Sequence, residues 1–330
     1  MIVLQATDVR KTMPMDETIT AMKRAFAALS DGRARTPLRA RLEVPTYEGE
    51  SMFMPVFVND AEGEEVLAVK IVSVFPRNTQ RGLPIIHAAV LVLDANTGRP
   101  IALLEGGVLT AIRTGAASGA ATDLLARTDS HVAAIFGAGV QARTQLEAIC
   151  TVRPIKTVWV YSPTTAREEA FIAEMAGQGP IPNDLRAATS PQQAVAEADV
   201  ICAATTSLTP VFADADLKPG VHINGIGSYT PAMQEVPAET VARALVVVDS
   251  YEAVLAEAGD LIQPIQQGII PEEHIHAEIG EIVLVRKHGR THPEQVTFFK
   301  SVGVAVQDAA AARLALRNAQ ALGIGQRVRW

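Results

Sequence analysis

Hydrophobic residues recur along the chain at two different spacings. Through residues 15–31 they follow one another at three- and four-residue steps, and Gly32 comes directly afterwards. This spacing predicts an amphipathic helix that opens the protein and ends near Gly32. Between about 36 and 105 the pattern changes to short apolar runs with turn residues between them. That pattern predicts a mixed or antiparallel sheet.

A different order of elements follows in the second half of the chain. Within residues 129–260, short apolar runs alternate with helical patterns from HVAAIF at 131–136 to SYEAVLAEA at 250–258. Such β-α alternation is typical of a parallel, doubly wound sheet with helices on both faces, so we predict a Rossmann-like domain here. The small residues of 110–125 predict a closely packed helix that bridges two domains. Residues 296–322 predict one more strand and a long alanine-rich helix.

Length and charge narrow the class of protein. The chain has 330 residues, enough for about two domains at roughly 150 residues each. Its net charge of −7 opposes nucleic acid or an anionic membrane as the main partner. No apolar run reaches ~20 residues and the first residues lack a signal-peptide pattern, so we expect no membrane span and a cytoplasmic location. Cys150 and Cys202 offer no disulfide framework, and we expect both to be buried.

A phosphate-binding turn follows the first strand of the predicted Rossmann domain. Gly137, Gly139 and Ala142 form a GxGxxA pattern between an apolar run and a helical pattern. The first glycine permits the tight turn, and the second lets backbone N–H groups approach a pyrophosphate at the helix N-terminus. The alternative interpretation is a tight strand-to-helix turn without a ligand. The repeated β-α context favours the dinucleotide site.

The end of the second Rossmann strand bears on the choice of cofactor. NAD-binding domains of this type place an acid there to hold the ribose 2′-hydroxyl. Here the run at 157–161 ends in Ser162, and Arg167 follows shortly after. A hydroxyl-rich turn with a nearby cation accommodates a 2′-phosphate, so NADP(H) is favoured and NAD(H) is possible. Helix capping by the same hydroxyls is compatible with either.

Two cations stand in unusual surroundings. Lys70 interrupts the apolar run EVLAVKIVSVF, where burying an unpaired ammonium would be costly. An edge strand or a side chain that reaches out to solvent is the alternative. Arg113 lies among small residues of a helix predicted to pack closely, so it needs an anionic partner. A carboxylate and the pyrophosphate of the cofactor are the two candidates for that partner.

Seven sequence blocks together carry a family resemblance. The chain resembles the ornithine cyclodeaminase/μ-crystallin family over nearly its whole length. The resemblance implies a Rossmann dinucleotide-binding domain at 119–301, inserted into an α+β substrate-binding and dimerisation domain at 1–118 plus 302–330. The blocks are TPLR at 36–39, FMP at 53–55, AVKIVSVFPRN at 68–78, GRPIALLEGGVLTAIRTGAASGAAT at 98–122, FGAGVQA at 136–142, HINGIGSYTPAMQE at 222–235 and FFKSVGVAVQD at 298–308.

The resemblance also implies roles for individual residues. Lys70 matches a catalytic lysine, which we expect to protonate the substrate nitrogen. The residues implied to bind substrate are Arg39, Lys70, Arg113, Tyr229 and Val302. Those implied to bind the cofactor are Arg113, Gly137, Gly139, Val140, Gln141, Ser162, Arg167, Thr205, Ile226, Gly227 and Ser301. No metal site is expected, and His87, His274 and His276 are interpreted as structural.

Two departures from the family pattern narrow the activity. Cyclodeaminases carry an aspartate where this chain has Tyr229 and a glutamate where it has Met52. Their absence disfavours ornithine cyclisation, and the first also disfavours alanine dehydrogenation. The resemblance then implies an NAD(P)H-dependent reductase of a cyclic α-imino acid, either Δ1-pyrroline-2-carboxylate or Δ1-piperideine-2-carboxylate. Cyclodeaminase or alanine dehydrogenase activity, and non-catalytic ligand binding, are the alternatives.

Oligomeric state follows from the apolar strands. EVLAVKIVSVF and LPIIHAAVLVLD are apolar at successive positions, so both faces of the predicted sheet are apolar. A monomer would leave a large patch uncovered, and we expect a homodimer built through this sheet.

Overall fold

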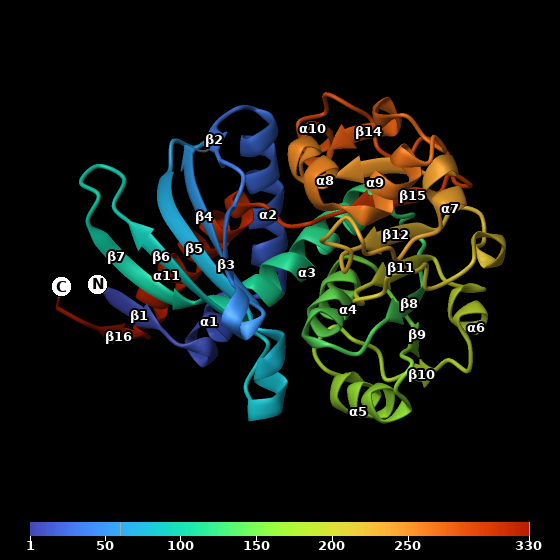
Figure 1. Cartoon of the computed structure of the whole chain (residues 1–330), viewed down its shortest axis with the longest axis horizontal. Coiled ribbons are helices and arrows are strands. Elements are labelled where there is room, and N and C mark those ends of the chain that lie inside the picture. The colour runs from blue at the N-terminus through green and yellow to red at the C-terminus, as the bar shows by residue number, and fades with distance from the viewer. Residues whose placement is uncertain (60, 330) are drawn as a thin grey trace. The chain divides into compact units, whose positions relative to one another are not determined.

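The chain folds into two compact units, each with its own sheet (Figure 1). A computed structural model describes residues 1–59 and 61–329. Unit 1 comprises Met1–Arg113 with Val304–Trp330, and unit 2 comprises Thr114–Gly303. The sequence placed the two boundaries at 118 and 301.

Unit 1 contains an eight-stranded mixed sheet, as predicted for 36–105. Its strands are β1 (Ile2–Leu4), β2 (Ala34–Arg35), β3 (Ala40–Val44), β4 (Gly49–Asn59), β5 (Glu65–Val74), β6 (Ile86–Leu93), β7 (Pro100–Glu105) and β16 (Gln326–Arg327). The order is β16–β1–β7–β6–β5–β4–β2, with β3 also paired to β4. The β1–β7 pairing is parallel, and the other pairings are antiparallel.

The predicted first helix is present as α2 (Met15–Ser30), but it does not open the protein. Strand β1 and helix α1 (Ala6–Thr12) precede it. Three residues are too few for a recognisable strand pattern, and β1 is held by partners distant in the sequence. Ile2 is in register with Ala102 on β7 and with Arg327 on β16. That pairing could not be read from the first residues themselves.

One face of the unit 1 sheet is closed by helix α11 (Ala305–Leu322). Along β5, Val66, Ala68, Lys70 and Val72 alternate with more exposed residues, so all four point to the same buried face. The alanines of α11 have no bulky side chains, which lets the helix approach the strands closely. Lys70 therefore lies in the core of unit 1 and not at a sheet edge, which excludes the edge-strand alternative.

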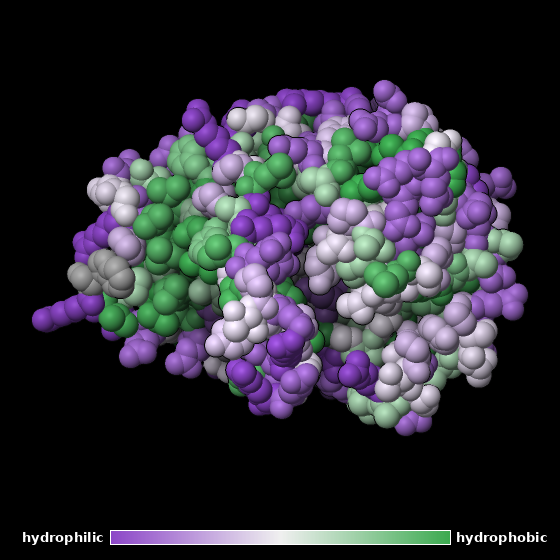
Figure 2. Space-filling model, viewed as in Figure 1, coloured by the Kyte–Doolittle hydropathy of each residue, from purple (hydrophilic) through white to green (hydrophobic). Residues whose placement is uncertain are grey.

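The opposite face of this sheet is apolar and half-exposed. Cross-strand pairing sets Phe53 beside Ile71, and Val69 between Pro55 and Leu91. Ile71 is 40% exposed. Figure 2 shows hydrophobic side chains gathered over the strands of this unit. The apolar character predicted for both faces is thus confirmed.

Unit 2 has the predicted Rossmann-like architecture. Its parallel sheet contains β8 (Val132–Phe136), β9 (Thr157–Tyr161), β10 (Leu185–Ala187), β11 (Val200–Ala203), β12 (His222–Gly225), β13 (Leu245–Val248), β14 (Ile275–Glu278) and β15 (Thr297–Lys300). The order is β10–β9–β8–β11–β12–β15–β13–β14, and every pairing is parallel. The buried apolar residues of its strands belong to two hydrophobic clusters. Such a sheet places ligand-binding loops at the carboxyl ends of its strands.

The helices of unit 2 connect these strands. They are α4 (Val140–Val152), α5 (Thr165–Met175), α6 (Pro191–Val195), α7 (Ala238–Arg243), α8 (Tyr251–Glu257), α9 (Gly259–Gln266) and α10 (Ile279–Val283). Helix α3 (Gly106–Leu125) runs on from unit 1 into unit 2, as the small-residue pattern predicted. Among the described residues no helix has the length and hydrophobicity to cross a membrane. Cys150 and Cys202 are both buried thiols, as expected.

Candidate functional site

The turn after β8 has the geometry of a phosphate-binding loop. Gly137 has φ of 99°, and a Cβ there would lie 2.7 Å from the carbonyl oxygen of Ala204. Gly139 precedes α4, and a Cβ on it would meet no atom within 4 Å. Val140 is 67% exposed, so the N-terminus of α4 is open to a ligand. Ala142 is fully buried against the sheet. These features fit a dinucleotide pyrophosphate over the backbone N–H groups of α4.

Arg143, in the first turn of helix α4, stabilises the glycine-containing turn. Its Nη1 donates to the carbonyl oxygens of Ala138 and Gly139, at 3.0 Å each. Its Nε donates to Glu174 on α5 at 2.9 Å, and its guanidinium lies over the ring of Phe171. The side chain therefore fixes the turn while adding positive charge close to it.

Ser162 and Arg167 lie where the ribose end of a dinucleotide is expected. The carbonyl oxygen of Tyr161, the last residue of β9, accepts from the backbone N–H of Gly137 at 2.9 Å, so the two turns adjoin. Arg167 is exposed on the first turn of α5. The neighbouring Glu168 is buried, and its carboxylate accepts from the backbone N–H of Ala188 at 3.2 Å. Glu168 also accepts from the backbone N–H of Ser162, so its carboxylate is held by the backbone of the protein.

A buried carboxylate joins the loops that follow β11 and β12. Glu235 Oε1 accepts from the backbone N–H of Thr205 at 2.6 Å and from its hydroxyl at 2.8 Å. Its Oε2 accepts from the backbone N–H of Gly227 at 2.6 Å. Burial and the charge of Asp260 raise the pKa of Glu235, while Lys300 lowers it. Glu235 thereby brings together two predicted cofactor residues from different loops.

A second buried carboxylate holds the loop after β15. Asp249 accepts from the hydroxyl of Ser301 at 2.7 Å and from the backbone N–H of Val302 at 3.0 Å. Burial raises the pKa of Asp249, against the lowering effect of these hydrogen bonds. Because its proton is donated to Asp249, the Ser301 hydroxyl is left as an acceptor. Ile226 is buried after β12, and Tyr229 is half-buried in the same loop.

Unit 1 holds a compact cluster of buried charges. Lys70 on β5 is 2% exposed, Arg113 on α3 is 5% exposed and Asp308 on α11 is 1% exposed. Lys70 Nζ lies 2.6 Å from Asp308 Oδ2. Arg113 Nε donates to Asp308 Oδ1 at 3.0 Å. Arg113 was expected to need an anionic partner, and the structure supplies a carboxylate from the protein itself.

Gln307 completes this charge cluster. Its Oε1 accepts from Arg113 Nη1 at 2.9 Å and from the backbone N–H of Val304 at 2.9 Å. These two donors fix which end of the amide is the oxygen. Its buried Nε2 has no acceptor within the described residues.

The surroundings of Lys70 set its protonation. Burial is the largest influence on Lys70 and lowers its pKa. The charges of Arg113 and Arg39 lower it further and Asp308 raises it, so that the pKa of Lys70 lies at about 7. Burial would raise the pKa of Asp308, but Arg113 and Lys70 hold it below its usual value. The expected lowering of the Lys70 pKa is therefore present, and Arg39 acts on the same group. A buried lysine that titrates near neutral pH suits proton transfer.

The two positions that depart from the cyclodeaminase pattern carry no acid. Met52 is buried on β4, two residues from Met54, which is in register with Lys70. The histidines take no part in the cluster. His274 and His276 contact backbone carbonyl oxygens through Nε2, and His87 is exposed on β6. No group of metal-binding side chains occurs among the described residues.

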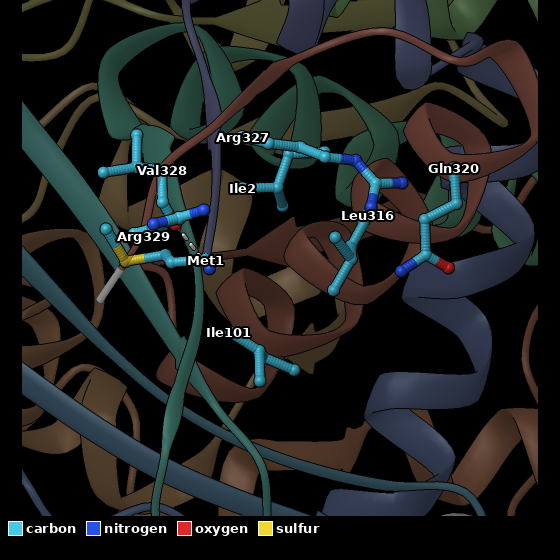
Figure 3. A pocket seen from close by; sticks show the side chains of 8 residues that line it. All are labelled: Met1, Ile2, Ile101, Leu316, Gln320, Arg327, Val328 and Arg329. Carbon is cyan, nitrogen blue, oxygen red and sulfur yellow. Dashed lines mark hydrogen bonds between the residues drawn. The ribbon is translucent and has the colours of Figure 1, made fainter.

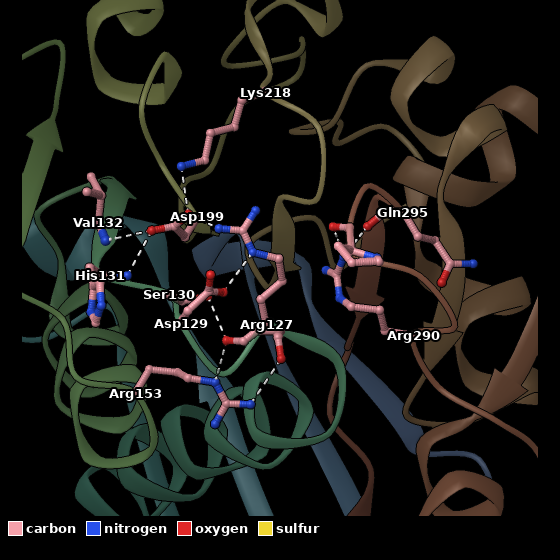
Figure 4. A network of polar contacts seen from close by, with 12 residues as sticks. Arg127, Asp129, Ser130, His131, Val132, Arg153, Asp199, Lys218, Arg290 and Gln295 are labelled. Carbon is pink, nitrogen blue, oxygen red and sulfur yellow. Dashed lines mark hydrogen bonds and ion pairs between the residues drawn. The ribbon is translucent and has the colours of Figure 1, made fainter.

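Two other features lie away from these sites. At the amino end of β8, Asp199 accepts from the backbone N–H groups of His131 and Val132 and pairs with Arg127 and Lys218 (Figure 4). The phosphate turn lies at the carboxyl end of that strand, so this network is structural. An open hollow in unit 1 lies beside the C-terminal part of α11 (Figure 3). Its lining residues are Met1, Ile2, Ile101, Leu316, Gln320, Arg327, Val328 and Arg329.

Sequence reasoning missed the carboxylates that organise the sites. Asp308 and Glu235 both lie inside the sequence blocks that carry the family resemblance, yet neither is among the predicted site residues. The sequence does hold one signal for Asp308. Lys70 and Arg113 both lie in apolar surroundings, and two such cations need a nearby anion. Asp249 and Arg143 gave no comparable signal, since charged residues beside turns are common.

A Rossmann-like unit with a GxGxxA turn, joined to a mixed-sheet unit with a buried lysine–arginine–aspartate cluster, defines a class of dinucleotide-dependent proteins. The chain belongs to the ornithine cyclodeaminase/mu-crystallin family, whose model matches residues 1–322. It is 41% identical over 329 residues to a Δ1-pyrroline-2-carboxylate reductase of Bacillus cereus, covering 99% of each chain.

Solved structures agree with this assignment. Thermococcus litoralis Δ1-pyrroline-2-carboxylate reductase in complex with NADH and L-proline matches with a TM-score of 0.94 and 43% identity. The match covers 99% of this chain and 100% of that one. An archaeal alanine dehydrogenase dimer with bound NAD matches with a TM-score of 0.91 and 31% identity, over 100% and 99% of the two chains.

Proposed function

We propose that this protein is an NAD(P)H-dependent reductase of a cyclic α-imino acid. Its substrate is Δ1-pyrroline-2-carboxylate or its six-membered homologue, and its product is L-proline or L-pipecolate. One observation carries the proposal: two buried cations, Lys70 and Arg113, share the single carboxylate of Asp308. The excess positive charge suits a substrate carboxylate. The similarity to Δ1-pyrroline-2-carboxylate reductases supports the same substrate class.

The residues of unit 1 perform the binding and proton-transfer steps. Arg113 uses Nε and Nη1 for Asp308 and Gln307, so its Nη2 is available to the substrate carboxylate. Arg39, whose charge acts on Lys70, is proposed to bind the same carboxylate. Lys70 donates its proton to the imine nitrogen, which makes C2 electrophilic. When bound, the reduced nicotinamide supplies the hydride that C2 accepts. Nitrogen gains one hydrogen and C2 the other, and Lys70 is left neutral.

The residues of unit 2 bind the cofactor. Gly137 and Gly139 would hold the pyrophosphate at the start of α4. The residues that would contact the nicotinamide and its ribose are Val140, Gln141, Thr205, Ile226, Gly227 and Ser301. Tyr229 and Val302 contact the substrate. In this proposal unit 1 is the substrate-binding and dimerisation domain, and unit 2 is the dinucleotide-binding domain.

A panel of substrates separates this proposal from its alternatives. Oxidation of NADPH or NADH is followed with both cyclic imines, and NAD(P)+ reduction with L-ornithine and L-alanine. We expect turnover with a cyclic imine that exceeds any activity on ornithine or alanine, because Met52 and Tyr229 offer no carboxylate for an amine. Preferred turnover of ornithine or alanine would contradict the proposal. Cofactor binding without any turnover would indicate a ligand-binding protein.

We expect NADPH to be preferred over NADH. The buried Glu168 carboxylate is occupied by the backbone N–H groups of Ala188 and Ser162, and the exposed cation of Arg167 is placed to meet a 2′-phosphate. Replacing Arg167 with alanine should raise KM for NADPH about tenfold and leave KM for NADH within about twofold. The matched control is Arg186→Ala, an exposed arginine that pairs with Asp184. A kcat/KM at least about tenfold higher with NADH in the unaltered protein would contradict the preference.

We expect a homodimer that covers the half-exposed apolar face of the unit 1 sheet. Light scattering at micromolar concentration should give twice the mass of the chain. Val69→Arg should give a monomer, because it places a charge at the centre of that face. Val285→Arg, the same change at an exposed valine of unit 2, should stay dimeric. A monomeric mass for the unaltered protein would rule the dimer out.

A further inference from the structure

Asp308 has a contact pattern that the proposed reaction does not explain by itself. It belongs to neither the predicted substrate-binding nor the predicted cofactor-binding residues, yet both cations of the buried cluster, Lys70 and Arg113, pair with it. Resting on the proposed function, we propose that Asp308 is a positioning residue that fixes the Lys70 ammonium and the Arg113 guanidinium and keeps the Lys70 proton in place for transfer.

The geometry divides the carboxylate between two partners. Oδ2 faces Lys70 Nζ at 2.6 Å, and Oδ1 accepts from Arg113 Nε at 3.0 Å. Because one planar group holds both, the two cations cannot change their separation independently. Gln307, the preceding residue, holds a second nitrogen of Arg113 at 2.9 Å. The guanidinium is therefore fixed at two points, and its Nη2 is left to face a ligand.

The position of Asp308 on its helix favours the ionised form. It lies in the first turn of α11, where the positive end of the helix dipole stabilises a negative charge. The Gln307 side chain accepts from the backbone N–H of Val304, which anchors the helix start. Asp308 is thus a charged group on a rigid support, as a positioning role requires.

The groups that face Lys70 come from several elements. Helix α11 contributes Asp308, α3 contributes Arg113, and the segment before β3 contributes Arg39. On the adjacent strands β4 and β6, the residues in register with Lys70 are Met54 and Val90, which carry no charge. Of the described groups that act on Lys70, Asp308 is the one that favours the protonated ammonium. Removing its charge should leave Lys70 neutral over most of the neutral pH range.

Asp308→Asn tests this directly, because asparagine keeps the size of the side chain and removes its charge. The Lys70 pKa lies at about 7 in the unaltered protein, and we expect it to fall by about one pH unit or more. A proton donor must be protonated, so the rate falls as pH rises through its pKa. The variant should therefore lose about tenfold in kcat at pH ~8 and stay within about threefold at pH ~6. A general loss of fold would lower the rate at both pH values.

The Lys70 pKa is also measured without turnover, by titrating the 13Cε chemical shift of labelled lysines. Loss of one signal in Lys70→Met assigns the resonance. Asp308→Glu, which keeps the charge, should restore both the pKa and the alkaline side of the rate profile towards the unaltered values. Glu105→Gln is the matched control, since Glu105 caps α3 in the same unit and is not among the groups that act on Lys70.

The outcomes separate the two claims. An unchanged Lys70 pKa in Asp308→Asn, or the same fall in Glu105→Gln, would overturn the role of Asp308. If the Asn variant does not fold, a Lys70 pKa in Asp308→Glu lower by about one pH unit would overturn it instead. The Lys70 pKa could fall in Asp308→Asn while the unaltered protein turns over no imine. That result would overturn the proposed function but support the coupling between Asp308 and Lys70.

Discussion

Replacing Lys70 with methionine is expected to lower kcat for imine reduction by about 10²-fold or more, the usual size of a general-acid contribution. Methionine keeps most of the apolar stem in the core of unit 1 and removes the ammonium that faces Asp308 at 2.6 Å. The affinity for the cofactor should stay within about threefold, because the GxGxxA turn belongs to unit 2. Steady-state kinetics with a cyclic imine, together with cofactor titration by fluorescence, measure both quantities.

The control for this variant is Lys11→Met, which removes an exposed lysine from α1 of the same unit. It should leave kcat unchanged. Near-normal turnover in Lys70→Met would remove the proton-donor role and leave bound water or Tyr229 as the donor. Loss of cofactor binding in Lys70→Met would instead show that Lys70 serves the cofactor.

Replacing Arg113 with lysine should act on binding more than on turnover. A lysine keeps the positive charge but lacks the planar guanidinium. In Arg113 that group contacts Asp308 and Gln307 with two of its nitrogens and presents the third, Nη2, to the substrate. Losing a charge-assisted hydrogen bond costs about 1.5–3 kcal/mol, which corresponds to a KM for the imine about 10- to 100-fold higher. We expect kcat to fall less than KM rises, since Lys70 keeps its place beside Asp308.

Arg41→Lys is the matched change at an exposed arginine of the same unit, where the partner is Glu50 at 3.0 Å. Its KM should match that of the unaltered protein. An Arg113→Lys variant with unchanged KM and a much lower kcat would assign Arg113 to the reaction step instead of to substrate binding.

The sequence predicted the parts of the fold that depend on local patterns. The two periodicities of hydrophobic residues located α2, the sheets and the Rossmann alternation, and Gly137 and Gly139 marked the phosphate turn. Lys70 was identified as unusual because a charge in a strand of apolar residues must be compensated. Each of these inferences uses residues that lie close together along the chain.

The parts that the sequence did not reveal depend on distant contacts. Strand β1 is held by β7 and β16, whose residues in register with Ile2 are Ala102, 100 residues away, and Arg327, 325 residues away. Asp308 lies 195 residues from Arg113, and no spacing rule joins them. Glu235 lies 30 residues beyond Thr205, within the same domain, but its role is visible only when two loops fold against it. Buried carboxylates of this kind are recognised by their donors, which only the folded chain assembles.

The central claim is that this chain reduces a cyclic α-imino acid. The most direct measurement follows NADPH oxidation by the purified protein with Δ1-pyrroline-2-carboxylate at pH ~7, and quantifies the product by chiral chromatography. The account predicts one L-proline formed for each NADPH oxidised, or one L-pipecolate with the six-membered imine, and almost no turnover in Lys70→Met. No cofactor oxidation with either imine, while the protein binds NADPH normally, would contradict it.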